Sequence, residues 1–210
     1  MLDAPLRRWL DPLTNRLAGG LVACGLRADA ITWAGFGVGV AAWVALAWTV
    51  YPLALVLIAL NRLMDGLDGA VARRLGPTDV GGYLDIVLDF FFYAGVPFFF
   101  AVGRPEVALP AAFLIFSFVG TGSSFLAYAI FAAKRGLTTQ RQGIKSFYYL
   151  GGLTEGTETI VFFIAICLFP DGFAVLAWVF GGLCWLTALG RVGAALVTFR
   201  ETHSCRETHS

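Results

Sequence analysis

The sequence has few charged residues and only two histidines. Charged residues make up 14% of the 210 positions, and the formal net charge is +1. Because the basic residues are spread along the chain and not massed in one arm, no nucleic-acid partner is indicated. His203 and His209 both lie close to the C-terminus. We therefore expect no histidine-based mechanism.

The cysteines show no pattern typical of a metal site. There is no CxxC motif and no Cys/His spacing suited to a metal ion. Small buried apolar residues, with one further cysteine near the C-terminus, account for them. The four positions are Cys24, Cys167, Cys184 and Cys205.

Apolar sequence dominates the rest of the chain. Hydrophobic residues make up 58% of the positions, and the mean hydropathy is +0.76. A helix needs about 20 residues to cross a hydrocarbon core of ~30 Å. We predict an all-α polytopic membrane protein with six transmembrane helices, near residues 30–49, 52–72, 81–102, 107–133, 146–169 and 172–199.

Three regions are expected along the chain. Residues 1–29 carry leucines and Trp9 at helical spacing, which predicts an amphipathic interfacial helix on the cytoplasmic side, with a solvated leader as the alternative. Residues 30–199 form the six-helix domain. In residues 200–210 the pentapeptide Arg-Glu-Thr-His-Ser occurs twice, and we expect a disordered tail.

The basic residues orient the six predicted helices. Cytoplasmic loops of membrane proteins carry an excess of Lys and Arg. With the N-terminus inside, the only basic residue on the outside is Arg104. The inside segments contain Arg7, Arg8, Arg16, Arg27, Arg73, Arg74, Lys134, Arg135, Arg141, Lys145, Arg200 and Arg206.

Four carboxylates interrupt the apolar sequence at Asp65, Asp68, Asp85 and Asp89. An ionised side chain at membrane depth costs at least roughly 2.5 kcal/mol. At 1.5 Å per residue, Asp65 and Asp89 both lie roughly 12 Å below the cytoplasmic end, and Asp68 and Asp85 lie roughly 6–7 Å below it. The i, i+3 and i, i+4 spacings place each pair on one helix face. Two antiparallel helices would therefore present all four acids to one cytoplasm-facing pocket.

Such a cluster needs compensating positive charge. Oxygen ligands suit hard cations such as Mg²⁺ or Mn²⁺, and we expect the cluster to hold two ions. A two-metal carboxylate site can grip a diphosphate while an oxygen nucleophile attacks. The neighbouring glycines leave room for a large ligand. Arg73, at the helix end, can bind phosphate oxygens.

These residues resemble the motif of the CDP-alcohol phosphatidyltransferase family, D-x2-D-G-x2-A-R, a spacer, then G-x3-D-x3-D. The spacer here has seven residues, 74–80, one fewer than is usual, so either Gly81 or Gly82 can be the motif glycine. We expect a slightly tighter turn between the two helices. The matching positions are Asp65, Asp68, Gly69, Ala72, Arg73, Gly81, Asp85 and Asp89.

The resemblance implies a function and a role for each motif residue. The family transfers a phosphatidyl group from a CDP-linked lipid, such as CDP-diacylglycerol, to an alcohol hydroxyl and releases CMP. It implies a six-helix fold, often a homodimer, in the inner membrane if the protein is bacterial. Asp65, Asp68 and Asp85 would bind the metals, and Asp89 would lie near the second metal and act as general base. Gly69 would contact the nucleotide, and Arg73 would bind the diphosphate.

The acceptor alcohol is left open by the sequence. Candidate residues are Arg141, Lys145, Glu155, Glu158 and Arg191. The basic ones suit a phosphorylated acceptor such as glycerol 3-phosphate, whereas the glutamates suit a polyol or an amino alcohol. Alternatively, the basic loop contacts anionic lipid and sets topology, and Arg191 only neutralises a glutamate.

Two other functions compete with the transferase. Intramembrane acids and arginines also mark cation or proton transporters, although here the acids cluster near one face and no inverted repeat is apparent. A non-catalytic assembly factor that retains the site is the third alternative. Arg62, one helical turn before Asp65, is expected to balance that carboxylate.

Overall fold

The computed structural model describes residues 3–136 and 154–207, and within these ranges every regular element is a helix. The predicted all-α class is therefore confirmed. The elements are α1 (Asp3–Ala23), α2 (Ala28–Ala47), α3 (Tyr51–Leu75), α4 (Asp79–Gly103), the 3₁₀ turn η1 (Pro105–Val107), α5 (Ala108–Lys134), α7 (Gly156–Leu168), the 3₁₀ turn η2 (Pro170–Gly172) and α8 (Phe173–Glu207).

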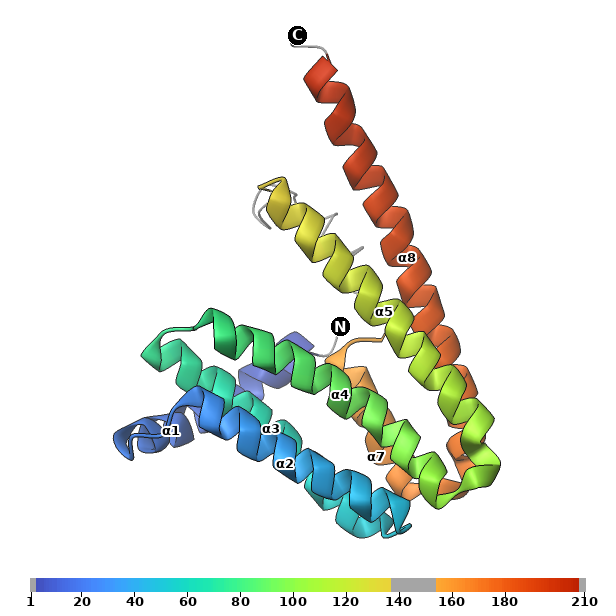
Figure 1. The fold of residues 1–210 in the computed structure, drawn as a ribbon. Coiled ribbons are helices and arrows are strands. Elements are labelled where there is room, and N and C mark those ends of the chain that lie inside the picture. Colours follow the sequence, from blue (N-terminus) through green and yellow to red (C-terminus); the bar gives the residue numbers. More distant parts are fainter. Residues whose placement is uncertain (1–2, 137–153, 208–210) are drawn as a thin grey trace.

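The helices form two groups that meet along α4 (Figure 1). In the first group, α2 packs against both α3 and α4, and α1 lies against α3. In the second group, α5 runs beside α8, and both extend away from the other helices (Figure 1). The short α7 contacts α3 and α8. Helix α4 contacts α2 on one side and α5 on the other, so its side chains can serve both groups.

A three-residue turn joins α3 to α4 and fixes the register of the two acidic helices. Gly76 ends α3 with a φ of 97°, a left-handed value that disfavours residues with a Cβ. Pro77 follows and cannot continue the helix. Thr78 then caps α4, its hydroxyl oxygen accepting a hydrogen bond from the Gly81 amide at 3.0 Å. The short spacer of the motif is accommodated in this turn.

Aromatic side chains fill the core between α3, α4, α7 and α8. Phe100 stacks on Phe173 with ring centroids 4.1 Å apart, and both are fully buried. Phe92 packs edge-on against Phe163. A Cβ at Gly39 of α2 would lie 2.8 Å from the Phe92 ring, so this glycine allows α2 to approach α4 closely. Aromatic pairs of this kind add to the area-based stability of the core.

Four helices in the described part of the chain are long and apolar enough to cross a membrane: α2, α4, α5 with η1, and α8. Helix α3 has 25 residues but carries Arg62, Asp65 and Asp68 in its second half, and α7 has only 13 residues. Large apolar side chains such as Leu109 and Val175 are exposed on the outer surfaces, as expected for contact with lipid. The count of six spans stays a prediction.

One predicted boundary differs from the structure. The fifth span was expected from residue 146, but Thr154 and Glu155 are not helical and α7 begins at Gly156, while residues 146–153 lie outside the described residues. Helix α8 extends to Glu207, and the disordered tail expected at residues 200–210 stays a prediction. Residues 200–207 contain no glycine or proline, so no helix-breaking residue ends α8. Helix α1 exists and includes Pro12, and its interfacial position stays a prediction.

Candidate metal centre

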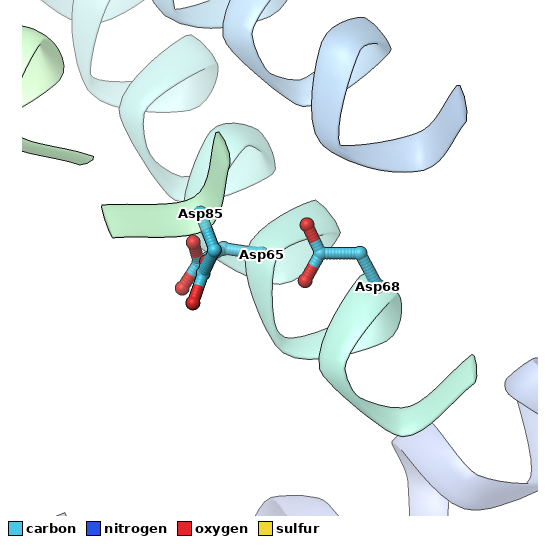
Figure 2. Close-up of side chains that lie close together, drawn as sticks. All are labelled: Asp65, Asp68 and Asp85. Carbon is cyan, nitrogen blue, oxygen red and sulfur yellow. The ribbon is translucent and has the colours of Figure 1, made fainter. Parts of the chain in front are cut away.

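Three of the four predicted carboxylates converge between α3 and α4. Asp65 and Asp68 lie on one face of α3, as their i, i+3 spacing requires, and Asp85 faces them from α4. One oxygen from each lies within 4.8 Å of the other two. Figure 2 shows the Asp68 carboxylate directed toward the pair formed by Asp65 and Asp85. The predicted meeting of the two helices at matching depth is therefore observed for these three acids.

A threonine from a third helix holds one of these carboxylates. The Thr32 hydroxyl on α2 lies 2.7 Å from Asp68 Oδ2 and donates to it. Asp68 is 5% exposed, the least exposed acid of the three. Hydrogen bonds that orient a ligand are part of a working metal site. Thr32 could not be identified from the sequence, because a threonine in an apolar helix has no distinctive spacing.

The fourth carboxylate, Asp89, is bound to an arginine. Arg62 Nη2 lies 2.8 Å from Asp89 Oδ1, whereas Arg62 Nη1 lies 3.7 Å from Asp65 Oδ2. Arg62 therefore pairs more closely with Asp89 than with Asp65, the partner expected from the sequence. Asp65 and Asp89 were predicted to lie at the same depth. This could have indicated that Arg62, one turn from Asp65, also reaches Asp89.

The residues fit a hard divalent cation. The centre offers only oxygen donors, from Asp65, Asp68 and Asp85, and these are the ligands that Mg²⁺ and Mn²⁺ prefer. With Asp89 the four acids carry a formal charge of −4, and Arg62 supplies +1. A surplus of negative charge at this density favours binding of a further cation.

A cavity of about 440 Å³ opens beside the centre toward the α3–α4 turn. Asp68 and Asp85 line it together with Gly69 and Arg73, the residues expected to contact a nucleotide and a diphosphate. A Cβ at Gly69 would lie 3.4 Å from Arg73 Nη1, so the glycine lets this guanidinium lie close to the helix.

Of the two motif glycines, Gly81 is the constrained one. A Cβ at Gly81 would lie 3.0 Å from the Thr78 hydroxyl oxygen and 3.2 Å from an Asp29 carboxylate oxygen. A Cβ at Gly82 would meet nothing within 4 Å. In the second half of the motif, close packing therefore requires a glycine at Gly81 but not at Gly82.

A second cavity, of about 570 Å³, lies between α4, α5, α7 and α8. Asp85 and Asp89 line it, as do Glu155 and Arg191. Arg191 Nη1 donates to the Thr121 carbonyl at 3.1 Å, and the guanidinium lies over the Phe125 ring. Asp85 borders both cavities, and charged residues make up a larger share of the lining of the first.

The other predicted acceptor residues have different positions. Glu155 and Glu158 form a capping box at the start of α7, in which the Glu155 amide donates to Glu158 Oε2 at 3.1 Å. Glu158 does not line the cavity described above, whereas Glu155 does. Arg141 and Lys145 lie outside the described residues.

Comparison with known proteins gives relatives along most of the chain. It is 52% identical to the inner membrane protein YnjF of Escherichia coli over 204 residues, 96% of this chain and 98% of that protein. It is 31% identical to a phosphatidylinositol phosphate synthase of Mycobacteroides abscessus over 205 residues, 93% of this chain and 84% of that protein.

The fold also matches solved structures of phosphatidylinositol phosphate synthase PgsA1 from Mycobacterium tuberculosis, at 21% identity. The complex with manganese and citrate gives a TM-score of 0.69, covering 87% of this chain and 88% of the other. The complex with CDP-DAG gives 0.64, covering 88% and 94%. The family model for CDP-alcohol phosphatidyltransferases matches residues 26–197. The chain therefore belongs to the CDP-alcohol phosphatidyltransferase family, and the family and enzyme class predicted from the acidic motif are confirmed.

Proposed function

We propose that this protein transfers a phosphatidyl group from a CDP-linked lipid, such as CDP-diacylglycerol, to the hydroxyl of an alcohol acceptor and releases CMP. The observation that carries the proposal is the position of the acid triad. Asp68 and Asp85 line one cavity together with Gly69 and Arg73, and Asp85 also lines a larger cavity together with Asp89. Donor and acceptor can thus reach the centre from two different cavities.

The donor side suits a nucleotide diphosphate. Arg73 can donate to the diphosphate oxygens from the end of α3, and Gly69 leaves the helix backbone open to the nucleotide. A Mg²⁺ or Mn²⁺ ion bound by the triad would neutralise charge on the diphosphate and on the departing CMP. The manganese in one mycobacterial structure and the CDP-DAG in the other support this assignment.

We assign the acceptor's proton to Asp89. The acceptor oxygen forms a bond to the lipid-side phosphorus, the bond from that phosphorus to the CMP oxygen breaks, and the electron pair leaves with CMP. The hydroxyl proton passes to the Asp89 carboxylate, which lines the larger cavity. General-base assistance of this kind contributes typically 10²- to 10⁴-fold.

The acceptor is an alcohol that fits beside Asp89, and Arg191 makes a phosphorylated polyol the first candidate. Arg191 lines the same cavity and carries a charge suited to a phosphate. The Mycobacteroides relative is named for the synthesis of phosphatidylinositol phosphate. An inositol phosphate therefore leads the list of acceptors to test, followed by glycerol 3-phosphate, free polyols and amino alcohols.

The membrane setting is part of the same proposal. Six spans would require α3 and the segment ending in α7 to cross the bilayer with the four apolar helices. The distribution of Lys and Arg supports a cytoplasmic N-terminus and active site, with residues 1–29 at the interface and residues 30–199 as the enzyme domain. The relation to an inner membrane protein supports that location. The homodimer stays a prediction.

A direct assay tests the transferase. Membranes containing the protein receive CDP-diacylglycerol, Mg²⁺ or Mn²⁺ and the acceptor panel, and released CMP and new lipids are measured. We expect metal-dependent CMP release that is lost in Asp85→Asn and retained in Asp171→Asn, a matched change in the turn before α8. Absence of turnover with every acceptor, together with ion flux in vesicles, would instead support the transporter.

A further inference from the structure

Arg62 is a positive charge built into the acid cluster. Its side chain is 11% exposed, and a charge this far from water must be paired to be tolerated. Its nearest charged partner is Asp89, with Nη2 2.8 Å from Oδ1. Asp65 lies further away, at 3.7 Å.

Neutral groups fix the Arg62 guanidinium on its other sides. Nε donates to Asn61 Oδ1 at 2.8 Å, and Nη1 donates to the Tyr93 hydroxyl oxygen at 3.1 Å. The guanidinium also lies 4.5 Å from the centroid of the Phe92 ring. Asn61 is itself held, because its Nδ2 donates to the Gly35 carbonyl of α2 at 2.8 Å. The cation is thus anchored by α2, α3 and α4 together.

Arg62 and the four acids line one small cavity, in which Asp89 lies outside the group of acids whose oxygens converge. The oxygens within 4.8 Å of one another belong to Asp65, Asp68 and Asp85. Asp89 Oδ1 accepts from Arg62, which leaves Oδ2 for another partner. A divalent ion bound at Asp89 would lie within a few ångströms of the guanidinium, and the two like charges would repel each other strongly in this poorly solvated place.

We propose that Arg62 takes the place of a second metal ion: the protein binds one divalent cation on Asp65, Asp68 and Asp85, and Arg62 holds Asp89 outside the ligand set. This inference rests on the proposed function, because it assigns Asp89 to the acceptor proton alone. Arg62 touches no reacting atom and is a positioning residue. The one-ion site differs from the two-ion site that the sequence suggests.

The number of bound Mn²⁺ ions tests the proposal without any measurement of turnover. Purified protein in detergent is titrated with Mn²⁺, with and without CDP-diacylglycerol, and tightly bound ions are counted by equilibrium dialysis. Electron paramagnetic resonance reports whether two ions lie close enough to couple, since paired metals in such sites are about 3.5–4 Å apart. We expect one uncoupled ion per chain under both conditions. Two ions, or a coupled spectrum, under either condition would overturn the proposal.

Variants separate the role of Arg62 from that of a structural ion pair. Arg62→Gln is expected to admit a second, coupled Mn²⁺, whereas Arg62→Lys, which keeps the charge, stays at one. Two bound Mn²⁺ ions in Arg62→Lys would contradict the proposal that the Arg62 charge replaces a second metal ion. One bound ion in a folded Arg62→Gln would contradict it as well. Arg104→Gln, which removes an ion-paired arginine elsewhere, is the matched control and keeps one ion.

A second comparison does not depend on the folding of Arg62→Gln. Asp89→Asn is expected to change the Mn²⁺ dissociation constant less than about threefold, whereas Asp68→Asn raises it more than about 100-fold, beyond the effect typical of an outer-shell change. An equal loss of affinity in both variants would place Asp89 among the ligands and overturn the inference. If the transferase assay failed while these results held, only the proposed activity would be lost.

Discussion

Two clusters in this protein each combine an arginine with carboxylates, and they differ in how much negative charge is left over. Arg104, after α4, binds Glu106 at 2.7 Å and Asp171 at 2.9 Å. Asp171 is 95% exposed, so water solvates much of this cluster. Arg62, on α3, is mostly buried and pairs with Asp65 and Asp89 in a cavity lined by four acids. The first cluster has a surplus of one negative charge, which water can solvate, whereas the second has a surplus of three that is partly removed from water.

The difference between the clusters separates a structural contact from a binding site. Arg104 Nη1 also donates to the Pro170 carbonyl, so its cluster ties the end of α4 to the turn before α8. Exposed pairs of this kind contribute little to stability. Repulsion among the surplus acids on α3 and α4 lowers the stability of the metal-free protein, and a bound cation would offset this effect. Function is therefore expected where the larger charge surplus is partly removed from water.

Removal of divalent ions should produce the largest effect. Chelation with EDTA should reduce CMP release to the background rate, because charge on the diphosphate would no longer be neutralised. Re-addition of Mn²⁺ or Mg²⁺ should restore it, and Ca²⁺ serves as a comparison ion. CMP release that continues at its full rate in EDTA would show that the acid surplus needs no metal.

Asp89→Asn should lower the rate of CMP release about 10²- to 10⁴-fold, because the acceptor hydroxyl loses its base. The measurement is kcat at saturating CDP-diacylglycerol, acceptor and Mn²⁺. Asp171→Asn removes the carboxylate bound to Arg104 and should leave kcat unchanged. Equal losses in the two variants would erase the distinction between the clusters.

Thr32→Val should weaken metal binding by about 10- to 100-fold, the range typical of lost outer-shell hydrogen bonds. The Asp68 carboxylate would lose its 2.7 Å contact with α2. The Mn²⁺ dissociation constant is the readout, and Thr32→Ser, which keeps the hydroxyl, is the matched control. Full Mn²⁺ affinity in Thr32→Val would show that α3 and α4 alone orient the ligands.

Arg104→Gln should have the smallest effect, lowering the Tm by no more than about 2–4 °C. CMP release at the assay temperature should not change, because this cluster borders neither cavity. Thermal unfolding in detergent and the CMP assay measure the two quantities. A large loss of activity at unchanged Tm would show that the turn before α8 communicates with the acid centre.

The parts of the site that repeat at helical spacing were predictable from the sequence. Asp65 and Asp68 share a helix face by spacing alone, and the short connection at residues 76–78 brings Asp85 opposite them. The motif supplied Gly69 and Arg73, which line one cavity as expected. These features depend on contacts close in sequence, which periodicity and depth can resolve.

Contacts between distant helices were not predictable in the same way. Thr32 reaches Asp68 across 36 positions, and Arg62 reaches Asp89 across 27. Both depend on the rotation of neighbouring helices, which periodicity leaves open. Glu155 and Glu158 were placed inside a span, yet they cap α7, because hydropathy does not reveal where a helix begins.

Binding of Mn²⁺ to the detergent-purified protein tests most directly whether the surplus acids form a metal centre. The dissociation constant is measured for the wild type and for Asp65→Asn, Asp68→Asn, Asp85→Asn and Asp171→Asn. We expect each of the first three variants to lose more than about 100-fold in affinity, and Asp171→Asn to bind as the wild type does. Wild-type affinity in the folded Asp68→Asn variant would contradict the account.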